Sequence, residues 1–285
     1  MQRHLAQLNV ATLRYPIDDP RAADFVEALP AVNGAGEVSP GYVWRLQSDG
    51  GDATDIRVFD DPLIIVNLTV WESLDALKAF AFRGLHRGYL RRRAEWFVEE
   101  STRTALWWLP TTQLPTTGDA KRRLAFIEAF GPSPYAFRLG QDHPQLVTEN
   151  ATIDDPRIRR LMAHVDDEVE QVVGDIEGAV VAELADVAEA FGTYRRVDAA
   201  TGHIDRIHVS RSARGMRLGA AIVAELEAAA ACAGVQRLCL HTFPAQREPY
   251  EGFGFVQRPC NHETAGSPRS LCLEKTLSRE SSRLA

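Results

Sequence analysis

The sequence predicts an α+β protein with two domains, a ferredoxin-like domain over residues 1–140 and a second α/β domain over residues 146–277. All five tryptophans lie before residue 110, whereas the later part of the chain has none and is rich in alanine. Between the two parts stands G-Q-D-H-P-Q (140–145), a polar, proline-marked stretch that is typical of a linker. A chain of 285 residues is long enough for two domains of ordinary size.

The sequence of the first part predicts strands and helices in the order β-α-β-β-α-β, followed by α-β. Strands are predicted at H-L-A-Q-L-N-V-A-T-L, G-Y-V-W-R-L-Q, P-L-I-I-V-N-L-T-V, T-A-L-W-W-L and the short Y-A-F-R-L. Helices are predicted after Asp19, an N-cap followed by Pro20, after Ser73, and over T-G-D-A-K-R-R-L-A-F-I-E-A-F. This order is that of the split βαβ, or ferredoxin-like, fold.

The second part has a different order of elements. Strands are predicted at G-A-V-V-A-E-L, E-A-F-G-T-Y-R-R-V, H-I-D-R-I-H-V, R-L-C-L-H-T and S-L-C-L-E-K-T-L. One long helix, L-G-A-A-I-V-A-E-L-E-A-A-A-A-C-A-G, is predicted to end at Gly234. We therefore expect an α/β domain.

Charge and composition argue against several classes of protein. A net charge of −7 and a pI near 5.7 disfavour a nucleic-acid-binding protein. No apolar run approaches the ~18–20 residues that span a membrane, and the N-terminus lacks the apolar core of a signal peptide, so a cytoplasmic protein is expected. The four cysteines have no C-x-x-C spacing, which predicts reduced thiols and no metal site.

The stretch V-S-R-S-A-R-G-M-R-L-G-A-A-I (209–222) carries the first functional signal. A strand that enters a short basic turn and then a helix offers backbone N–H groups and a positive helix end to a phosphate. The stretch resembles the coenzyme A loop of the GCN5-related N-acetyltransferases, whose pattern is Q/R-x-x-G-x-G/A. Arg214 and Gly219 fit the first and last positions. Arg217 replaces the middle glycine, where its side chain either crowds a pyrophosphate or points outward and assists it.

A second stretch, H-T-F-P-A-Q-R-E-P-Y-E-G-F-G-F, resembles a later conserved region of the same superfamily. The resemblance covers residues 146–277 and implies an acetyltransferase-type α/β domain with a mixed sheet. It also implies acetyl-CoA as cofactor and direct transfer of its acetyl group to a small amine. Tyr250 corresponds to the tyrosine that protonates the departing thiolate. The cofactor-binding residues that the resemblance implies are Val209, Arg214, Gly215, Arg217, Leu218, Gly219 and Ala220.

Many members of the superfamily carry a glutamate as base on the strand before the loop. The corresponding run here is G-H-I-D-R-I-H-V, so His203 and Asp205 are the candidates, on one face of the strand by its period of two. The alternatives are that His203 is solvated, that Asp205 pairs with Arg206 or Arg196, and that Tyr250 only packs. His208 and His241 are predicted to be structural.

The first part, over residues 3–139, resembles an uncharacterised bacterial domain family related to the antibiotic-biosynthesis monooxygenases. The phrases G-Y-V-W-R-L, N-L-T-V-W-E-S-L and L-W-W-L-P carry this resemblance. It implies a dimeric α/β barrel, and hence a homodimer through this domain. Haem-degrading relatives use an Asn, a Trp and a His in that order, which this chain offers as Asn9, Trp71 and His86, with Asn67 as a further polar candidate. The alternative is that the tryptophans form a core or a dimer interface.

Three functions follow from these signals. The first is an acetyl-CoA-dependent N-acetyltransferase acting on a small amine. The second is a non-catalytic sensor that binds coenzyme A or another ligand, which Arg217 in place of glycine favours. The third is a cofactor-independent or haem-linked monooxygenase in the first domain.

Overall fold

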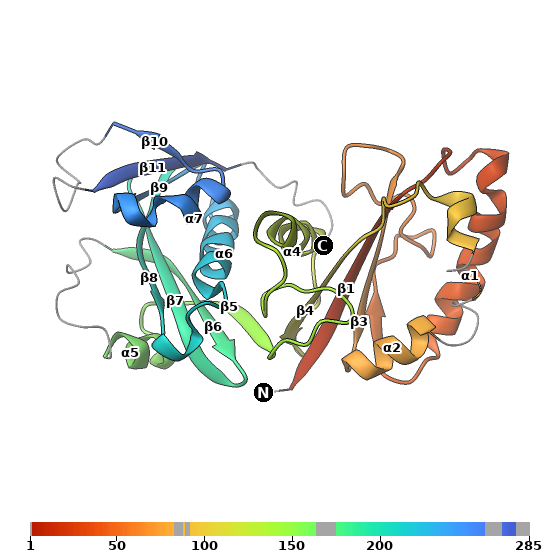
Figure 1. Ribbon diagram of the computed structural model, residues 1–285, viewed down its shortest axis with the longest axis horizontal. Helices are drawn as coiled ribbons and strands as arrows, with labels where there is room; N and C mark the ends of the chain where they lie inside the picture. Colours follow the sequence, from red (N-terminus) through yellow and green to blue (C-terminus); the bar gives the residue numbers. More distant parts are fainter. Residues whose placement is uncertain (1, 83–87, 89–91, 164–174, 260–269, 278–285) are drawn as a thin grey trace. The chain divides into compact units, whose positions relative to one another are not determined.

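The computed structural model describes residues 2–82, 88, 92–163, 175–259 and 270–277, and the chain forms two compact units (Figure 1). Unit 1 consists of Met1–Glu128 and Ala136–Asp142, and unit 2 of Ala129–Tyr135 and His143–Ala285. The short segment Ala129–Tyr135 therefore belongs to unit 2, although the residues on either side of it belong to unit 1.

Unit 1 contains a four-stranded antiparallel sheet in the order β2-β3-β1-β4. Its strands are β1 Arg3–Thr12, β2 Tyr42–Arg45, β3 Ile64–Trp71 and β4 Arg103–Pro110. Its helices are α1 Ala23–Glu37, which follows the 3-10 turn Pro20–Ala22, α2 Leu74–Phe82, and α4 Thr117–Phe130, whose last two residues belong to unit 2. Helices α1 and α2 lie on one side of the sheet (Figure 1). The closing strand expected at Y-A-F-R-L is only a single bridge between Phe137 and Leu106.

Aromatic side chains form much of the core of unit 1. Trp71 is 1% exposed and lies between Tyr42 and Phe80, with ring centroids 5.6 and 5.1 Å away. Trp96, Trp107 and Trp108 are buried as well. Most of the tryptophan-rich sequence is thus explained by core packing, one of the alternatives that the sequence left open.

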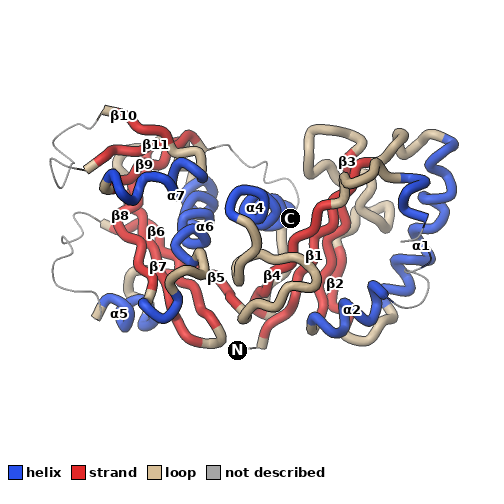
Figure 2. The backbone as a smooth tube through the Cα atoms, viewed as in Figure 1, coloured by secondary structure: helices blue, strands red, loops and turns tan. Residues whose placement is uncertain are grey.

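Unit 2 contains a seven-stranded sheet in the order β10-β11-β9-β8-β7-β6-β5 (Figure 2). Among the strand pairs that the structure describes, only β8 and β9 are parallel, so the predicted mixed sheet is confirmed. The strands are β5 Leu146–Ala151, β6 Ile176–Leu184, β7 Val187–Arg196, β8 Thr201–Val209, β9 Arg237–Thr242, β10 Val256–Arg258 and β11 Leu271–Thr276. The helices are α5 Pro156–Met162, α6 Leu218–Cys232 and α7 Arg247–Gly252, with 3-10 turns at Arg211–Ala213 and Pro244–Gln246.

Helix α6 packs closely on β7 because β7 has a glycine under it. A Cβ atom on Gly192 would lie 2.3 Å from Ile222 Cγ2 and 2.8 Å from Leu226 Cδ1, and both side chains are fully buried. We therefore expect Gly192→Ala to lower the free energy of unfolding by about 2 kcal/mol through overpacking, as measured by urea denaturation. Gly34→Ala, where a Cβ would meet nothing within 4 Å, is the control and should not destabilise the protein. An equally stable Gly192→Ala variant would contradict this packing.

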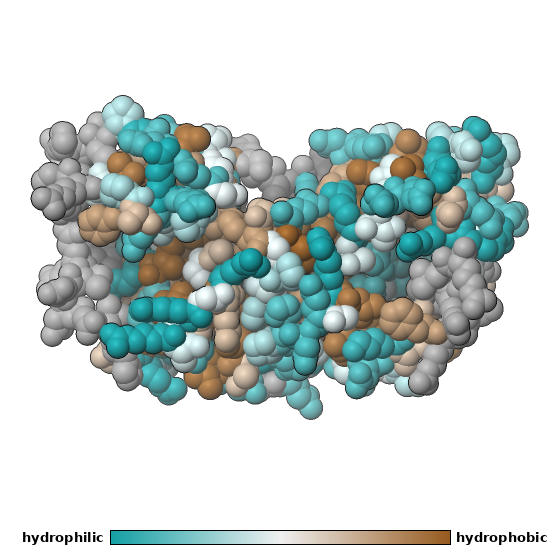
Figure 3. Space-filling view, viewed as in Figure 1, coloured by the Kyte–Doolittle hydropathy of each residue, from teal (hydrophilic) through white to brown (hydrophobic). Residues whose placement is uncertain are grey.

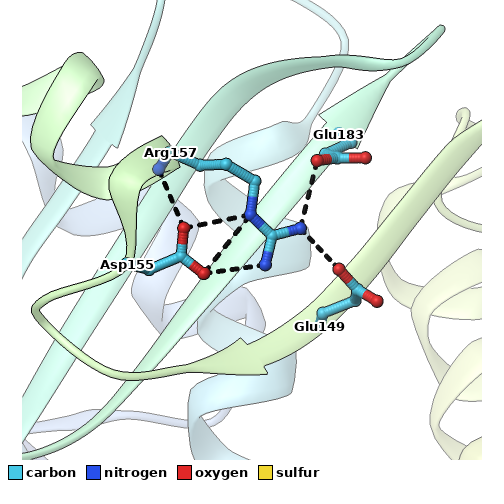
Figure 4. Close-up of polar contacts among 4 residues, drawn as sticks. All are labelled: Glu149, Asp155, Arg157 and Glu183. Atoms are coloured by element: carbon cyan, nitrogen blue, oxygen red, sulfur yellow. Dashed lines mark hydrogen bonds and ion pairs between the residues drawn. The ribbon is translucent and has the colours of Figure 1, made fainter.

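One arginine anchors the start of α5 to the sheet (Figure 4). Asp155 caps the helix by accepting from the Arg157 backbone N–H at 2.8 Å, and the Arg157 guanidinium binds Asp155, Glu149 of β5 and Glu183 of β6. Hydrogen bonds from Arg157 hold the pKa of Asp155 below its ordinary value. The cluster joins α5, β5 and β6, and we assign it a structural role.

The predicted state of the cysteines is wrong in one place. Cys232 and Cys239 are free, as expected, but Cys272 is disulfide-bonded. The prediction relied on the lack of close cysteine spacing, whereas a disulfide requires proximity in space and not in sequence.

The described ranges contain no helix with the length and apolar character needed to cross a membrane, and no cluster of three or more potential metal ligands. The face seen in Figure 3 carries hydrophilic side chains over both units, with smaller hydrophobic areas scattered among these side chains. This agrees with the 25% of charged residues in the sequence.

Candidate active site

Strands β8 and β9 pair along only part of their length. The parallel ladder runs from Thr201–Arg237 to Ile204–Leu240, while β8 continues to Val209. At the same point β8 carries a bulge: Ile204 pairs with Tyr194 and Arg206 with Thr193, so Asp205 is the extra residue. A bulge interrupts the ladder and redirects the local side chain. The sheet therefore opens between β8 and β9 beside Asp205.

The turn after β8 leads directly into the start of α6. Gly215 has φ +83°, and Arg217, the N-cap of α6, has φ +60° and makes no capping bond with its side chain. The first turn of a helix leaves its N–H groups without intrahelical partners, here those of Leu218, Gly219 and Ala220. Arg211 and Arg214 lie exposed in the same turn. These donors and charges suit a phosphate group.

Arg217 has a backbone conformation that favours glycine, which gives a physical reason for the glycine in the superfamily pattern. Its guanidinium Nη1 donates to the Pro132 carbonyl at 2.8 Å, inside unit 2. A Cβ on Gly131 would lie 3.2 Å from the same Nη1. The side chain is thus held against the segment Ala129–Tyr135.

A chain of polar side chains crosses three strands beside the opening. Arg195 Nε of β7 donates to Asp205 Oδ1 of β8 at 2.9 Å. The same oxygen lies 3.0 Å from His203 Nδ1, and His203 Nε2 lies 3.2 Å from Nδ1 of His241 on β9. We call these four residues the polar network. Strand register explains it, since Arg195 is paired with His203, and His203 is paired with Cys239, two residues before His241.

These contacts decide between the alternatives for the predicted base residues. His203 is 9% exposed and therefore buried, not solvated. Asp205 pairs with Arg195 and not with Arg196, which binds Glu177. Oδ2 of Asp205 is buried and has no hydrogen-bond partner among the described residues.

His241 is the member of the network that sequence reasoning missed. It was predicted to be structural, because sequence alone does not show which residue of β9 lies beside Asp205. Burial lowers its pKa below the ordinary value, and the charges of His203, Arg195 and Arg258 act in the same direction. Asp205 opposes this shift. His208, the other histidine predicted to be structural, packs against Phe191 with ring centroids 5.7 Å apart.

Tyr250 lies on the short helix α7, half-buried, with its ring edge-on to Phe255 at 6.2 Å. Burial raises the pKa of its phenol, so the hydroxyl keeps its proton at neutral pH. The side chain therefore has both a packing contact and a proton that it can donate.

The candidate residues of the first domain are only partly brought together. Asn9 of β1 and Asn67 of β3 are direct cross-strand partners. Trp71 is a core residue, and its Nε1 donates to Thr69 Oγ1 at 2.9 Å. His86 lies outside the described residues.

Two family models match the chain. The domain of unknown function DUF3291 matches residues 4–155, which is more than half of the chain, and the acetyltransferase (GNAT) family matches residues 133–255. The chain belongs to the DUF3291 family and carries a GNAT acetyltransferase domain. The GNAT match includes β8, the turn after it, α6 and Tyr250. Acetyltransferases of this family use acetyl-CoA, as the resemblance implied.

Solved structures of acetyltransferases are similar to part of this chain. A GNAT family acetyltransferase from Elizabethkingia anophelis with acetyl-CoA bound is 14% identical (TM-score 0.39; 46% of this chain and 98% of that chain covered). The ribosomal-protein-S18-alanine N-acetyltransferase from Escherichia coli is 15% identical (TM-score 0.38; 48% and 99% covered). The IAA acetyltransferase from Bacillus cereus is also 15% identical (TM-score 0.39; 47% and 100% covered). No curated protein matches the sequence.

Proposed function

We propose that the GNAT domain transfers an acetyl group from acetyl-CoA to a small amine by direct attack. The observation that carries the proposal is the coincidence of three features within a few residues of β8. The ladder to β9 ends at Ile204, the bulge stands at Asp205, and the uncapped start of α6 follows the same strand. An extended ligand with a phosphate at one end matches that combination of open strand edge and helix terminus.

The residues present fit acetyl-CoA. The N–H groups at the start of α6 and the nearby arginines suit its phosphates. A Cβ on Gly219 would lie 3.7 Å from the nearest protein atom outside its own helix, so glycine is not required there by the protein's own packing. We propose that the cofactor is held by Val209, Arg214, Gly215, Arg217, Leu218, Gly219 and Ala220. Arg217 would act through its backbone, since its guanidinium is engaged with Pro132.

Bound acetyl-CoA supplies an acetyl group activated as a thioester. A backbone N–H of β8 near the bulge stabilises negative charge on the carbonyl oxygen. The polar network, which contains His203 and Asp205, takes up the proton of the amine, and the Tyr250 hydroxyl gives a proton to the departing sulfur. Each group starts in the required state, because His241 favours the neutral form and Tyr250 favours the protonated form.

The test is amine-dependent release of free thiol from acetyl-CoA by the full chain. The full chain is needed because the segment Ala129–Tyr135 belongs to unit 2. A panel of amino acids, polyamines and aromatic amines should yield at least one acetylated product, identified by mass spectrometry. Calorimetry should show coenzyme A binding in the micromolar range. Binding without transfer to any amine would instead support the sensor.

Substitution of Arg217 by glycine tests whether the arginine at this position of the pattern weakens coenzyme A binding. We expect Arg217→Gly to change the free energy of unfolding by less than about 1 kcal/mol. The cost of the left-handed conformation that it removes, about 1 kcal/mol, offsets a lost hydrogen bond of similar size. We also expect the coenzyme A affinity to stay within about threefold, a change below 1 kcal/mol, because the guanidinium is already turned to Pro132. A much tighter complex, measured by calorimetry, would show that Arg217 crowds the pyrophosphate.

For the N-terminal part, we propose a ferredoxin-like domain over residues 1–140, ahead of the acetyltransferase domain over 146–277. The sheet order β2-β3-β1-β4 and the position of α1 and α2 on one side support it. Homodimerisation through this domain, ligand binding by Asn9 and Asn67, and a cytoplasmic location stay predictions. Light scattering of the full chain tests the first of them.

A further inference from the structure

Both ring nitrogens of His203 are already engaged inside the protein. Nδ1 lies 3.0 Å from Asp205 Oδ1, and Nε2 lies 3.2 Å from His241 Nδ1. The ring is also buried. A histidine in this position cannot receive a proton directly from an amine in the opening between β8 and β9. His203 instead connects Asp205 to His241.

When both imidazoles are neutral, the order of donors and acceptors determines where each proton lies. A carboxylate oxygen only accepts, so His203 Nδ1 carries the hydrogen that Asp205 receives. In a neutral imidazole the other nitrogen is then an acceptor, so His203 Nε2 accepts from His241 Nδ1–H. The remaining nitrogen, His241 Nε2, therefore carries no hydrogen and has a free lone pair. That is the form of histidine that accepts a proton.

We propose that His241 is the base of the acetyl transfer, through Nε2, and that His203 and Asp205 are positioning residues that act through it. This inference rests on the proposed acetyltransferase function. His241 directly follows Leu240, where the pairing of β8 with β9 ends, and it is half-buried. Its Nε2 has no hydrogen-bond partner in the part of the chain that the structure describes. The nitrogen is thus available at the opening.

In the proposed reaction His241 takes one proton and Tyr250 gives one. As the amine nitrogen bonds to the acetyl carbon, its proton passes to His241 Nε2, and as the C–S bond breaks, the sulfur takes the proton of the Tyr250 hydroxyl. His241 Nδ1 then shares its hydrogen with His203 Nε2, which moves positive charge toward the Asp205 carboxylate. Arg195 keeps that carboxylate in place through its ion pair. Solvent returns the proton from His241 to Tyr250, so that no net proton is consumed or released.

The charged and titratable groups around His241 come from four other strands. His203 and Asp205 lie on β8, Arg195 on β7, Arg258 on β10, and Glu274 on β11, where it binds Arg258 and accepts from Cys239 of β9. Burial is the largest influence and lowers the pKa of His241 below the ordinary 6.5. A base must be deprotonated, so kcat/KM should rise with pH through this lowered pKa and level off above it.

The first test needs no acetyl-CoA. Nitrogen-15 NMR of the imidazoles in the full chain, at a pH above the His241 pKa, reports which ring nitrogen carries the hydrogen. We expect the Nδ1–H form for both His203 and His241. A hydrogen on Nε2 of His241 would overturn the proposal whether or not the protein transfers acetyl groups.

The second test uses two substitutions. His241→Asn keeps an N–H donor toward His203 but removes the base, so amine-dependent transfer should fall more than roughly tenfold with the coenzyme A affinity unchanged. His143→Asn, outside the polar network, is the matched control. In Asp205→Asn the acid limb of the kcat/KM profile should move to lower pH, because Asp205 raises the pKa of His241. If the acid limb of the Asp205→Asn profile does not move, or if the His241→Asn variant is active, the proposed roles of His241 and Asp205 are wrong. A wild-type protein that acetylates no amine would instead contradict the proposed function.

Discussion

Gly219→Asp is expected to weaken coenzyme A binding by at least roughly 100-fold while the domain stays folded. A carboxylate at the start of α6 would occupy the position of the phosphate and repel it, and a 100-fold loss corresponds to about 2.7 kcal/mol. The fold should tolerate the change. The nearest protein atoms to a Cβ at this position outside its own helix, Val209 Cγ2 and Ile207 Cγ2, lie 3.7 and 4.0 Å away, and an acidic residue in the first turn stabilises a helix.

The measurement is calorimetric titration of the full chain with coenzyme A, with circular dichroism and thermal melting to confirm the fold. Gly219→Ala is the matched control, because it adds the Cβ without the charge and should lose far less affinity. Equal losses in the two variants would mean that space beside the helix, and not charge, limits binding. Unchanged affinity in Gly219→Asp would remove this turn from the cofactor site.

The sequence predicted the parts of unit 2 that local pattern determines. The strand before the loop and the alanine-rich helix depend on neighbouring residues, and both are present in the structure. The mixed sheet, which the resemblance implied, is present as well. Strand β5 was missed, because its two buried residues, Leu146 and Val147, make too short an apolar run to distinguish a strand from a linker. The closing strand predicted at Y-A-F-R-L failed for the opposite reason. Its residues have strand propensity but pair at only one position.

The candidate site was harder to predict than the strands and helices of unit 2, because its contacts join residues that are far apart in the sequence. Arg206 and Arg196 were the alternative partners considered for Asp205, yet it pairs with Arg195 across the β7–β8 ladder. His241 joins the network only because β8 and β9 run parallel in one particular register. Arg217 was ambiguous in sequence, and its hydrogen bond to Pro132 comes from a segment far away in the chain. None of these partners could be identified from the sequence, because each contact depends on strand register or on the tertiary fold.

Tyr250→Phe should lower kcat about 100-fold, because the substitution removes the proton donor for the leaving sulfur but keeps the ring that faces Phe255. Coenzyme A affinity should not change. The defect should be constant with pH as long as the phenol is protonated, because a general acid works only in its protonated form and burial raises the pKa of Tyr250 above its ordinary value.

Steady-state kinetics between about pH 6.5 and pH 9.5, a range below the ordinary phenol pKa of about 10, measures the defect where the raised phenol pKa keeps wild-type Tyr250 protonated. Tyr194→Phe is the matched control, because Tyr194 is a buried tyrosine of β7 in the same unit, and burial likewise raises its pKa. A Tyr250→Phe enzyme with wild-type turnover would reduce Tyr250 to packing. A loss of coenzyme A affinity with little loss of kcat would assign Tyr250 to positioning the cofactor.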